Sequence, residues 1–278
     1  MAEILKGKPV ADRLNEETSK IIEGLDHKPT LSVIRVGENE DDISYEKAII
    51  KRCEKNNISC KCTLLANDIS KDDYLNLIKD NNADKKVDGI ILLNQIYKEA
   101  LTTISAKKDI DGCNPINLSS AFLNDNTGFI PCTAQAVMEL LDYYDIKVEG
   151  KNITVIGRSM TVGKPLSMLL LNKNATVTIC HSHTKDIKQH TLNSDIVITA
   201  IGKAEMFDQS YFKEDQIVID VGINYSETKQ KICGDVLFEE VEKVVSKITP
   251  VPLGVGSVTN AILINHLAKA ALRNQNEH

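Results

Sequence analysis

The sequence predicts an α/β protein that has two domains and a parallel sheet. Strand-like apolar runs and helix-like amphipathic runs alternate along almost the whole chain, as expected for right-handed βαβ crossovers. The 278 residues are just under twice the ~150 residues of an average domain. With 42% apolar and 26% charged residues, the composition is that of a soluble globular chain.

The charge balance argues against nucleic acid as the main partner. Thirty-three Lys and Arg against 39 Asp and Glu leave a net charge of −6, whereas nucleic-acid phosphates select basic surfaces. No apolar run approaches the ~20 residues of a membrane span, and the first residues lack the apolar core of a signal peptide. We therefore expect a cytoplasmic protein with neither a membrane nor a nucleic-acid partner.

The seven cysteines do not form a metal-binding pattern. There is no C-x-x-C pair, and Cys60 and Cys62 have the wrong spacing and no nearby His for a zinc site. Reduced thiols used as small apolar residues are the simplest interpretation, and we expect no metal.

In the first half of the chain, a helical face near residues 10–25 precedes a strand at 31–36 that Gly37 ends. The near-continuous apolar run at 87–93 is typical of a strand buried on both faces. Residues 107–117 are turn-rich and show no period. The other elements expected here are a helix at 42–56, a strand at 58–65 and a helix at 69–79.

In the second half, Asn152–Ile156 predicts a strand, 157–162 a Gly/Ser loop and Lys164–Leu171 a helix. The domain change should fall within 118–150, and the last helix should return to the first domain. The other elements expected here are helices at 133–144 and 259–272 and strands at 175–180, 196–201 and 217–221.

The loop after the 152–156 strand has the context of a phosphate-binding turn. It is not G-x-G-x-x-G, because Ser159 stands at the second glycine position, so an ordinary βα turn is the alternative. Gly157 allows a sharp turn off the strand. Gly163 and Pro165 open a helix whose free N–H groups could receive a pyrophosphate.

The next strand favours NADP over NAD. An NAD site usually ends this strand with an acid that binds the ribose hydroxyls, but residues 179–184 contain none. Arg158 and Lys164 provide cations for a 2′-phosphate. His181 and His183 either join this site or form a solvated strand end.

Six motifs follow one another in order along residues 4 to 273. They are Tyr45 on its helix, Lys-Asp-Ile-Asp-Gly at 108–112, Pro-Cys-Thr at 131–133, the loop at 157–165, Asp-Val-Gly-Ile-Asn at 220–224, and residues 249–256 followed by Thr259. Together they resemble the methylenetetrahydrofolate dehydrogenase/cyclohydrolase family. The resemblance implies an N-terminal folate domain, 1–120, completed by the helix at 258–278. It also implies a Rossmann-like NADP domain at 145–255, a cleft between the two α/β domains, and a homodimer.

The family transfers a hydride from 5,10-methylenetetrahydrofolate to NADP and then hydrolyses the methenyl product to 10-formyltetrahydrofolate. The resemblance makes Tyr45 and Asp111 catalytic and substrate-binding, and Thr133 a hinge residue. From the residues alone, Tyr45 could be a surface helix residue, Asp111 a turn residue, and Thr133 a helix N-cap. The remaining implied contacts are Pro252, Gly254 and Gly256 for the folate and Gly157, Arg158, Ser159, Lys164, Ser182 and Ile223 for the cofactor.

The chain departs from the family where water is activated. The family has a lysine four residues after the tyrosine, and this chain has Ile49. Lys47 and Lys51 should point away from that helix face. Arg52 returns to the face, but a guanidinium shuttles protons poorly.

A second departure concerns the glutamine that assists this lysine in the family. Leu93 stands at its position, and Gln95 could serve only if the strand end shifted by two residues. We therefore expect a dehydrogenase with weak or absent cyclohydrolase activity. The alternatives are a fully bifunctional enzyme, a non-catalytic folate- or NADP-binding paralogue, and a dehydrogenase acting on a small hydroxy or amino acid.

Overall fold

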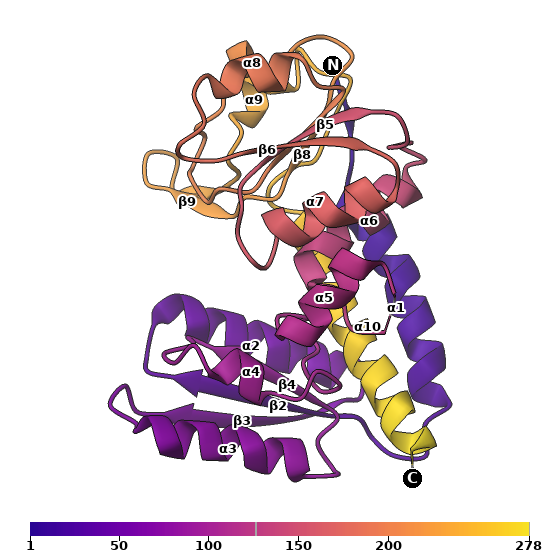
Figure 1. Ribbon diagram of the computed structural model, residues 1–278, viewed down its shortest axis with the longest axis vertical. Coiled ribbons are helices and arrows are strands. Elements are labelled where there is room, and N and C mark those ends of the chain that lie inside the picture. The colour runs from indigo at the N-terminus through magenta and orange to yellow at the C-terminus, as the bar shows by residue number, and fades with distance from the viewer. Residues whose placement is uncertain (126, 278) are drawn as a thin grey trace. The chain divides into compact units, whose positions relative to one another are not determined.

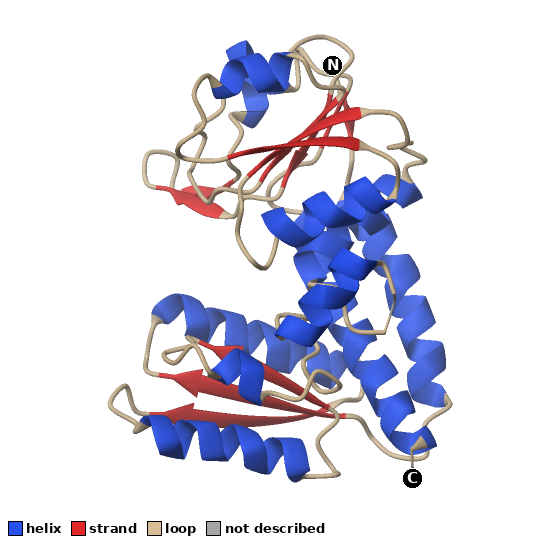
Figure 2. Ribbon diagram, viewed as in Figure 1, coloured by secondary structure: helices blue, strands red, loops and turns tan. Residues whose placement is uncertain are grey.

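The computed structural model describes residues 1–125 and 127–277, and the chain divides into two compact units. Each unit contains a sheet flanked by helices (Figure 2). We call them the three-stranded unit and the six-stranded unit. The three-stranded unit comprises Leu14–Ser120, Asp125 with 127–130, and the residues from Leu263 onward. The six-stranded unit comprises Met1–Arg13, Ala121–Asn124 and Pro131–Ile262.

In the three-stranded unit, β2 (Thr30–Val36) pairs in parallel with β3 (Ser59–Leu65) on one side and β4 (Gly89–Leu93) on the other. Helices α2 (Glu40–Lys55) and α3 (Lys71–Ala83) cover opposite faces of this sheet (Figure 1). Apolar side chains from the sheet, from α3 and from the segment that follows β4 form one buried cluster.

The strand order of this unit reverses at β2. The chain leaves β2 for β3 and then returns past β2 to β4, so the carboxyl ends of β2 and β4 form a switch point, where α/β proteins usually bind ligands. Gly37 and Asn94 begin the two loops there with φ angles of 75° and 58°. The Asn94 side-chain amide donates to the Val36 carbonyl at 3.0 Å and ties the loops together.

The six-stranded unit contains a fully parallel sheet in the order β1-β11-β8-β7-β5-β6. An antiparallel hairpin, β9 (Asn224–Ser226) and β10 (Lys231–Cys233), follows β8. The sheet strands are β1 (Glu3–Ile4), β5 (Asn152–Ile156), β6 (Thr176–Cys180), β7 (Ile196–Thr199), β8 (Ile217–Asp220) and β11 (Lys247–Ile248). The helices are α6 (Cys132–Tyr143), α7 (Gly163–Asn172), α8 (Ile187–Leu192) and α9 (Phe238–Val241), with a 3₁₀ turn at Gln209–Tyr211.

Two long helices, α1 (Gly7–Glu23) and α10 (Val255–Asn276), contribute residues to both units. Two shorter helices, α4 (Ala100–Thr103) and α5 (Pro115–Leu123), complete the chain. No helix in the described part of the chain has the length and apolarity that crossing a membrane requires.

The predicted α/β class and the parallel sheets are confirmed, whereas several local predictions are wrong. The turn-rich stretch ends early because α5 begins at Pro115, where the Asn114 side chain accepts the Ile116 N–H at 2.7 Å. Thr133 is not an N-cap, since the cap position of α6 is Pro131 and no side chain caps that helix. The strands β1, β9, β10 and β11 have two or three residues each, too few for a periodic pattern to reveal.

A buried histidine ties α10 to the loop after α4 in the three-stranded unit. One ring nitrogen of His266, Nδ1, lies 2.8 Å from the Ile110 carbonyl oxygen, so it donates its hydrogen there. The ring stacks on Phe129 with centroids 4.7 Å apart. Burial lowers the pKa of His266 to about 4, so the imidazole is neutral at pH 7.

This histidine should make the free energy of unfolding depend on pH. The unfolded chain binds a proton near pH 6.5 and the folded chain only near pH 4, so stability is complete above pH 6.5 and falls by about 3 kcal/mol towards pH 4. The His266→Gln variant has no group here that titrates, so its stability should not show this fall. The difference in unfolding free energy between parent and variant should therefore shrink as the pH falls from 6.5 to 4. Urea unfolding at several pH values measures it, and a difference that stays constant from pH 6.5 to 4 would contradict the assignment.

Candidate functional site

The turn after β5 lies where the order of the six-stranded sheet reverses. From β5 the chain passes to β6 on one side and returns to β7 on the other, so the carboxyl ends of β5 and β7 form the switch point. Gly157 follows β5 with φ 134°, and a Cβ there would lie 2.3 Å from the Ala200 carbonyl oxygen. Only glycine allows the two loops to approach this closely.

A second close approach opens α7. A Cβ at Gly163 would lie 2.2 Å from the Gly157 carbonyl oxygen, so the helix starts directly against the turn. The Ser159 hydroxyl accepts the Val162 and Gly163 N–H groups at 3.1 and 3.3 Å. The expectation that this helix start presents free N–H groups is therefore wrong, because Ser159 accepts the N–H groups of Gly163 and Lys164, and Pro165 has none.

The loop after β6 presents hydroxyl and imidazole groups. The His181 N–H donates to Thr184 Oγ1 at 2.9 Å, and the His183 N–H donates to His181 Nδ1 at 3.1 Å. Ser182 is exposed. The first acid after this strand, Asp186, is the N-cap of α8, where its side chain accepts the Gln189 N–H.

The two predicted cations of this site, Arg158 and Lys164, are exposed at the start of α7. The Lys164 ammonium lies 3.3 Å from the sulfur of Met160. The region thus offers cations and hydroxyls, and its first acid is already used as a cap.

Two further predicted contacts lie side by side in the six-stranded unit. Ile223 is 67% exposed, and its Cδ1 lies 3.4 Å from the position that a Cβ of Gly256 would occupy. Pro252 follows a cis peptide bond. A Cβ at Gly254 would lie 2.3 Å from the Pro250 carbonyl oxygen, so this loop is also built on a close backbone approach.

Sequence reasoning gave no role to two buried carboxylates that organise these loops. Asp220, at the end of β8, accepts the N–H groups of Gly222, Asp235 and Val236 at 2.9–3.1 Å. Burial raises the pKa of Asp220 to about 7. The sequence signal for Asp220 was an acidic residue at the end of an apolar strand. The Asp235 carboxylate accepts from the Ile201 N–H, the Lys203 N–H and the Asn224 side-chain amide.

In the three-stranded unit, α2 carries the predicted tyrosine. Tyr45 is 38% exposed, and Ile49, one turn further along, is fully buried. Arg35 on β2 anchors the helix, because its Nε donates to Glu46 Oε2 at 2.9 Å. Asp111 is partly exposed and accepts from the Cys113 thiol at 3.5 Å.

The strand end that should supply a glutamine is apolar. β4 ends at Leu93, which is 6% exposed and pairs with Arg35, so the strand does not shift to bring Gln95 into that position. Lys47 and Lys51 are exposed. The two positions at which the family resemblance implies a lysine and a glutamine are thus both apolar and buried.

Arg52 is the remaining cation on this face of α2. It is half-buried, and its NH1 atom has no hydrogen-bond partner. Burial lowers the pKa of this guanidinium.

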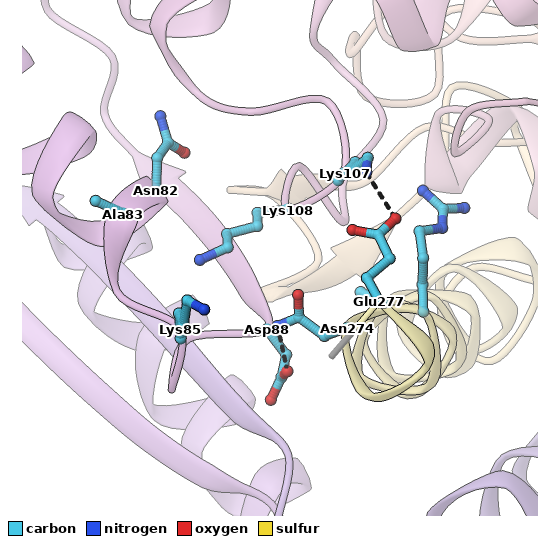
Figure 3. A pocket seen from close by; sticks show the side chains of 10 residues that line it. Asn82, Ala83, Lys85, Asp88, Lys107, Lys108, Asn274 and Glu277 are labelled. Carbon is cyan, nitrogen blue, oxygen red and sulfur yellow. Dashed lines mark hydrogen bonds and ion pairs between the residues drawn. The ribbon is translucent and has the colours of Figure 1, made fainter.

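A cavity of about 280 Å³ in the three-stranded unit is a structural feature and not the candidate site (Figure 3). It lies near the amino end of β4, away from the switch point. Its charged side chains close helix ends, since the Lys108 ammonium donates to the Asn81 and Asp84 carbonyls at the end of α3. Lys107 pairs with Glu277 at 2.6 Å. Among the described residues, no group of three or more His, Cys, Asp or Glu could hold a metal ion.

Two family models cover most of the chain. Residues 5–111 match the catalytic domain of tetrahydrofolate dehydrogenase/cyclohydrolase. Residues 131–275 match the NAD(P)-binding domain of the same family.

The chain is also similar to known proteins over their full length. The chain is 48% identical to a bifunctional protein FolD of Clostridium botulinum, covering 99% of this chain and 100% of that protein. It resembles the crystal structure of the bifunctional FolD enzyme of Campylobacter jejuni with a TM-score of 0.93, 39% identity and coverage of 98% and 99%. A Trypanosoma brucei FolD complexed with NADP and an inhibitor matches with a TM-score of 0.89, 27% identity and coverage of 100% and 99%. The chain therefore belongs to the tetrahydrofolate dehydrogenase/cyclohydrolase family.

Proposed function

We propose that this protein oxidises 5,10-methylenetetrahydrofolate with NADP and hydrolyses the methenyl product weakly or not at all. The observation that carries the proposal is the pair of buried apolar residues, Ile49 and Leu93, at the water-activating positions. In this proposal, residues 1–120 with 258–278 bind the folate and residues 145–255 bind the cofactor. We also propose a cytoplasmic location, which the seven free thiols support.

The hydride step asks the protein for orientation rather than for a strong base. A ring-nitrogen lone pair of the folate assists hydride loss and yields the methenyl cation directly. NADP, when bound, supplies the hydride acceptor. The close backbone approaches at Gly157 and Gly163 set the path of this turn, and in this proposal the pyrophosphate lies against it. Arg158, Lys164 and Ser182 would hold the 2′-phosphate.

Folate binding would use groups that the chain retains. In this proposal the Asp111 carboxylate accepts hydrogen bonds from the 2-amino and N3 groups of the pterin. Tyr45 and the loop that contains Pro252, Gly254 and Gly256 contact the rest of the substrate. The partial exposure of both Tyr45 and Asp111 supports these roles.

Hydrolysis makes a different demand, because a group must activate water and manage protons. An isoleucine side chain can do neither, and Leu93 supplies no polar partner. Arg52 keeps its proton near neutral pH even though burial lowers its pKa. Gln95 is exposed beyond the end of β4.

Separate assays of the two steps test this proposal. With NADP and 5,10-methylenetetrahydrofolate the enzyme should form the methenyl product, which is followed by its absorbance. That absorbance should then fall at the same rate with enzyme as without it. Methenyl decay well above the spontaneous rate would show a fully bifunctional enzyme. Tight binding of both ligands without hydride transfer would show a non-catalytic paralogue.

Restoring the lysine alone should not fully restore hydrolysis. Ile49→Lys lacks the partner group at position 93. The double variant, Ile49→Lys with Leu93→Gln, should hydrolyse the methenyl product about 10²-fold faster than the parent protein. Ile50→Lys, a cation on the next residue of the helix, is the matched control. Recovery of hydrolysis to the double variant's rate by Ile49→Lys alone would contradict the role given to Leu93.

The cofactor turn should not tolerate a single methyl group. Gly163→Ala places a Cβ 2.2 Å from a backbone oxygen, so the turn must move, and NADP binding should weaken about tenfold or more. Gly24→Ala, whose Cβ would make only ordinary contacts, is the control. Fluorescence titration with NADP measures both. An unchanged dissociation constant for Gly163→Ala would remove this turn from the site.

We also propose that the chain forms a homodimer through the β9–β10 hairpin. Tyr225 and Ile232 are register partners, so their side chains share one face, and they are 57% and 48% exposed. Ile232→Lys should convert a dimer into a monomer in light scattering coupled to gel filtration. Leu171→Lys, at an equally exposed leucine on α7, should leave the dimer intact. A monomeric parent protein, or a dimeric Ile232→Lys, would refute the hairpin interface.

A further inference from the structure

Three of the seven cysteines lie together in the three-stranded unit. Cys53 is near the end of α2, and Cys60 and Cys62 are on β3. The sulfur atoms of Cys60 and Cys62 are 3.7 Å apart. α2 packs against β3, which brings Cys53 close enough to Cys60 for the two thiols to interact. Cys60 therefore has a neighbouring thiol on each side.

The three thiols differ in their access to solvent. Cys60 and Cys62 are two residues apart on a strand, so their side chains lie on one face. β3 is an edge strand that pairs with β2 alone, which leaves Cys62 exposed. Cys60 is half-buried, and Cys53 is fully buried.

The three thiols also differ in pKa. Interaction with the Cys60 thiol lowers the pKa of Cys53, and the neighbouring Arg52 adds to this effect. The same interaction raises the pKa of Cys60, and desolvation raises the pKa of Cys62 to about 12. The thiol that most readily becomes a thiolate is thus the one that solvent cannot reach, so its available reaction partner is the sulfur of Cys60.

We propose that these three residues form an oxidation site in which hydrogen peroxide reacts at Cys62 and the product is a Cys53–Cys60 disulfide. This proposal does not depend on the proposed enzymatic function. It requires the oxidised state to pass from Cys62 to Cys60 and then to Cys53. Among the described residues, no group of three or more His, Cys, Asp or Glu could hold a metal ion, so metal binding does not compete for these thiols.

The steps balance as follows. Cys62 reacts first because it is the thiol that solvent reaches, and its raised pKa makes this step the slow one. The thiol loses its proton to solvent, the Cys62 sulfur attacks one peroxide oxygen, the O–O bond breaks, and a sulfenic acid and one water form. The Cys60 sulfur attacks the Cys62 sulfur, an S–S bond forms, and the S–O bond breaks with loss of a second water. The Cys53 thiolate then attacks the Cys60 sulfur and releases Cys62 as a thiol. In total, two thiols and one peroxide give one disulfide and two waters.

Strand geometry explains why the disulfide moves on from Cys62. Residues two apart on a strand have Cα atoms ~6.4–6.8 Å apart, at the upper limit of the range that disulfides allow. A Cys60–Cys62 bond is therefore strained and easily exchanged. Cys53 approaches from a different element, and the Ile58 N–H bonds the Cys53 carbonyl at 2.8 Å, which holds the connection between α2 and β3.

Trypsin separates the three cysteines, which makes the products distinguishable. Cleavage after Arg52, Lys55, Lys61 and Lys71 places Cys53, Cys60 and Cys62 in three different peptides. The intact protein is treated with hydrogen peroxide, free thiols are alkylated, and the digest is analysed by mass spectrometry. The expected product links 53–55 to 56–61, is reversed by dithiothreitol, and leaves Cys62 alkylated.

Serine variants test each step. Cys53→Ser should accumulate the 60–62 disulfide, which dithiothreitol should reduce faster than the parent's bond. Cys60→Ser should form no disulfide, and its Cys62 should proceed to sulfinic and sulfonic acid. Cys62→Ser should form the 53–60 disulfide more slowly than the parent, and Cys233→Ser is the control with the parent pattern.

Two results would overturn the proposal. One is irreversible oxidation of Cys62 in the parent protein at the rate seen in Cys60→Ser. The other is formation of the 53–60 disulfide in Cys62→Ser at the parent rate, which would show that Cys62 is not the point of entry. Circular dichroism confirms that each variant is folded before it is compared.

Discussion

The carboxyl edge of the six-stranded sheet depends on backbone segments that approach more closely than any side chain allows. Gly157 lies against the Ala200 carbonyl and Gly163 against the Gly157 carbonyl, each at a distance that excludes a Cβ. These contacts fix the turn, the start of α7 and the loop after β7 relative to one another. The buried carboxylates of Asp220 and Asp235 then hold the next loops at the same edge through backbone N–H groups. Together, these contacts tie four loops to one edge of the sheet.

The three-stranded unit repeats the topology without repeating this chemistry. Its switch point also lies between a strand and its returning neighbour, and its loops also begin at residues of positive φ, Gly37 and Asn94. What differs is the side chains above that edge. Tyr45 remains partly exposed there, whereas Ile49 and Leu93 are packed into the interior. Two apolar side chains therefore lie where our proposal places the lysine and glutamine of the family.

Sequence reasoning predicted what periodicity and composition control. The longer strands and helices and the α/β class follow from apolar patterns, and the six motifs identified the family. It failed where a local contact decides. The Ser159 hydroxyl takes N–H groups that a glycine count leaves free, and Thr133 follows a helix start that no side chain caps. Spacing alone also could not bring Cys53 to Cys60, because that contact depends on how α2 packs against β3.

The proposed weakness of hydrolysis follows from how differently the two steps would depend on single side chains. Hydride transfer would rely on contacts spread over several loops. Water activation would rely on one titratable group and its partner, and Ile49 and Leu93 stand at those two positions in our proposal. Because position 49 is packed without solvent, an ammonium placed there must also overcome desolvation, which disfavours its charged form. In this proposal, hydrolysis therefore requires a polar neighbour at position 93 as well as a lysine at position 49.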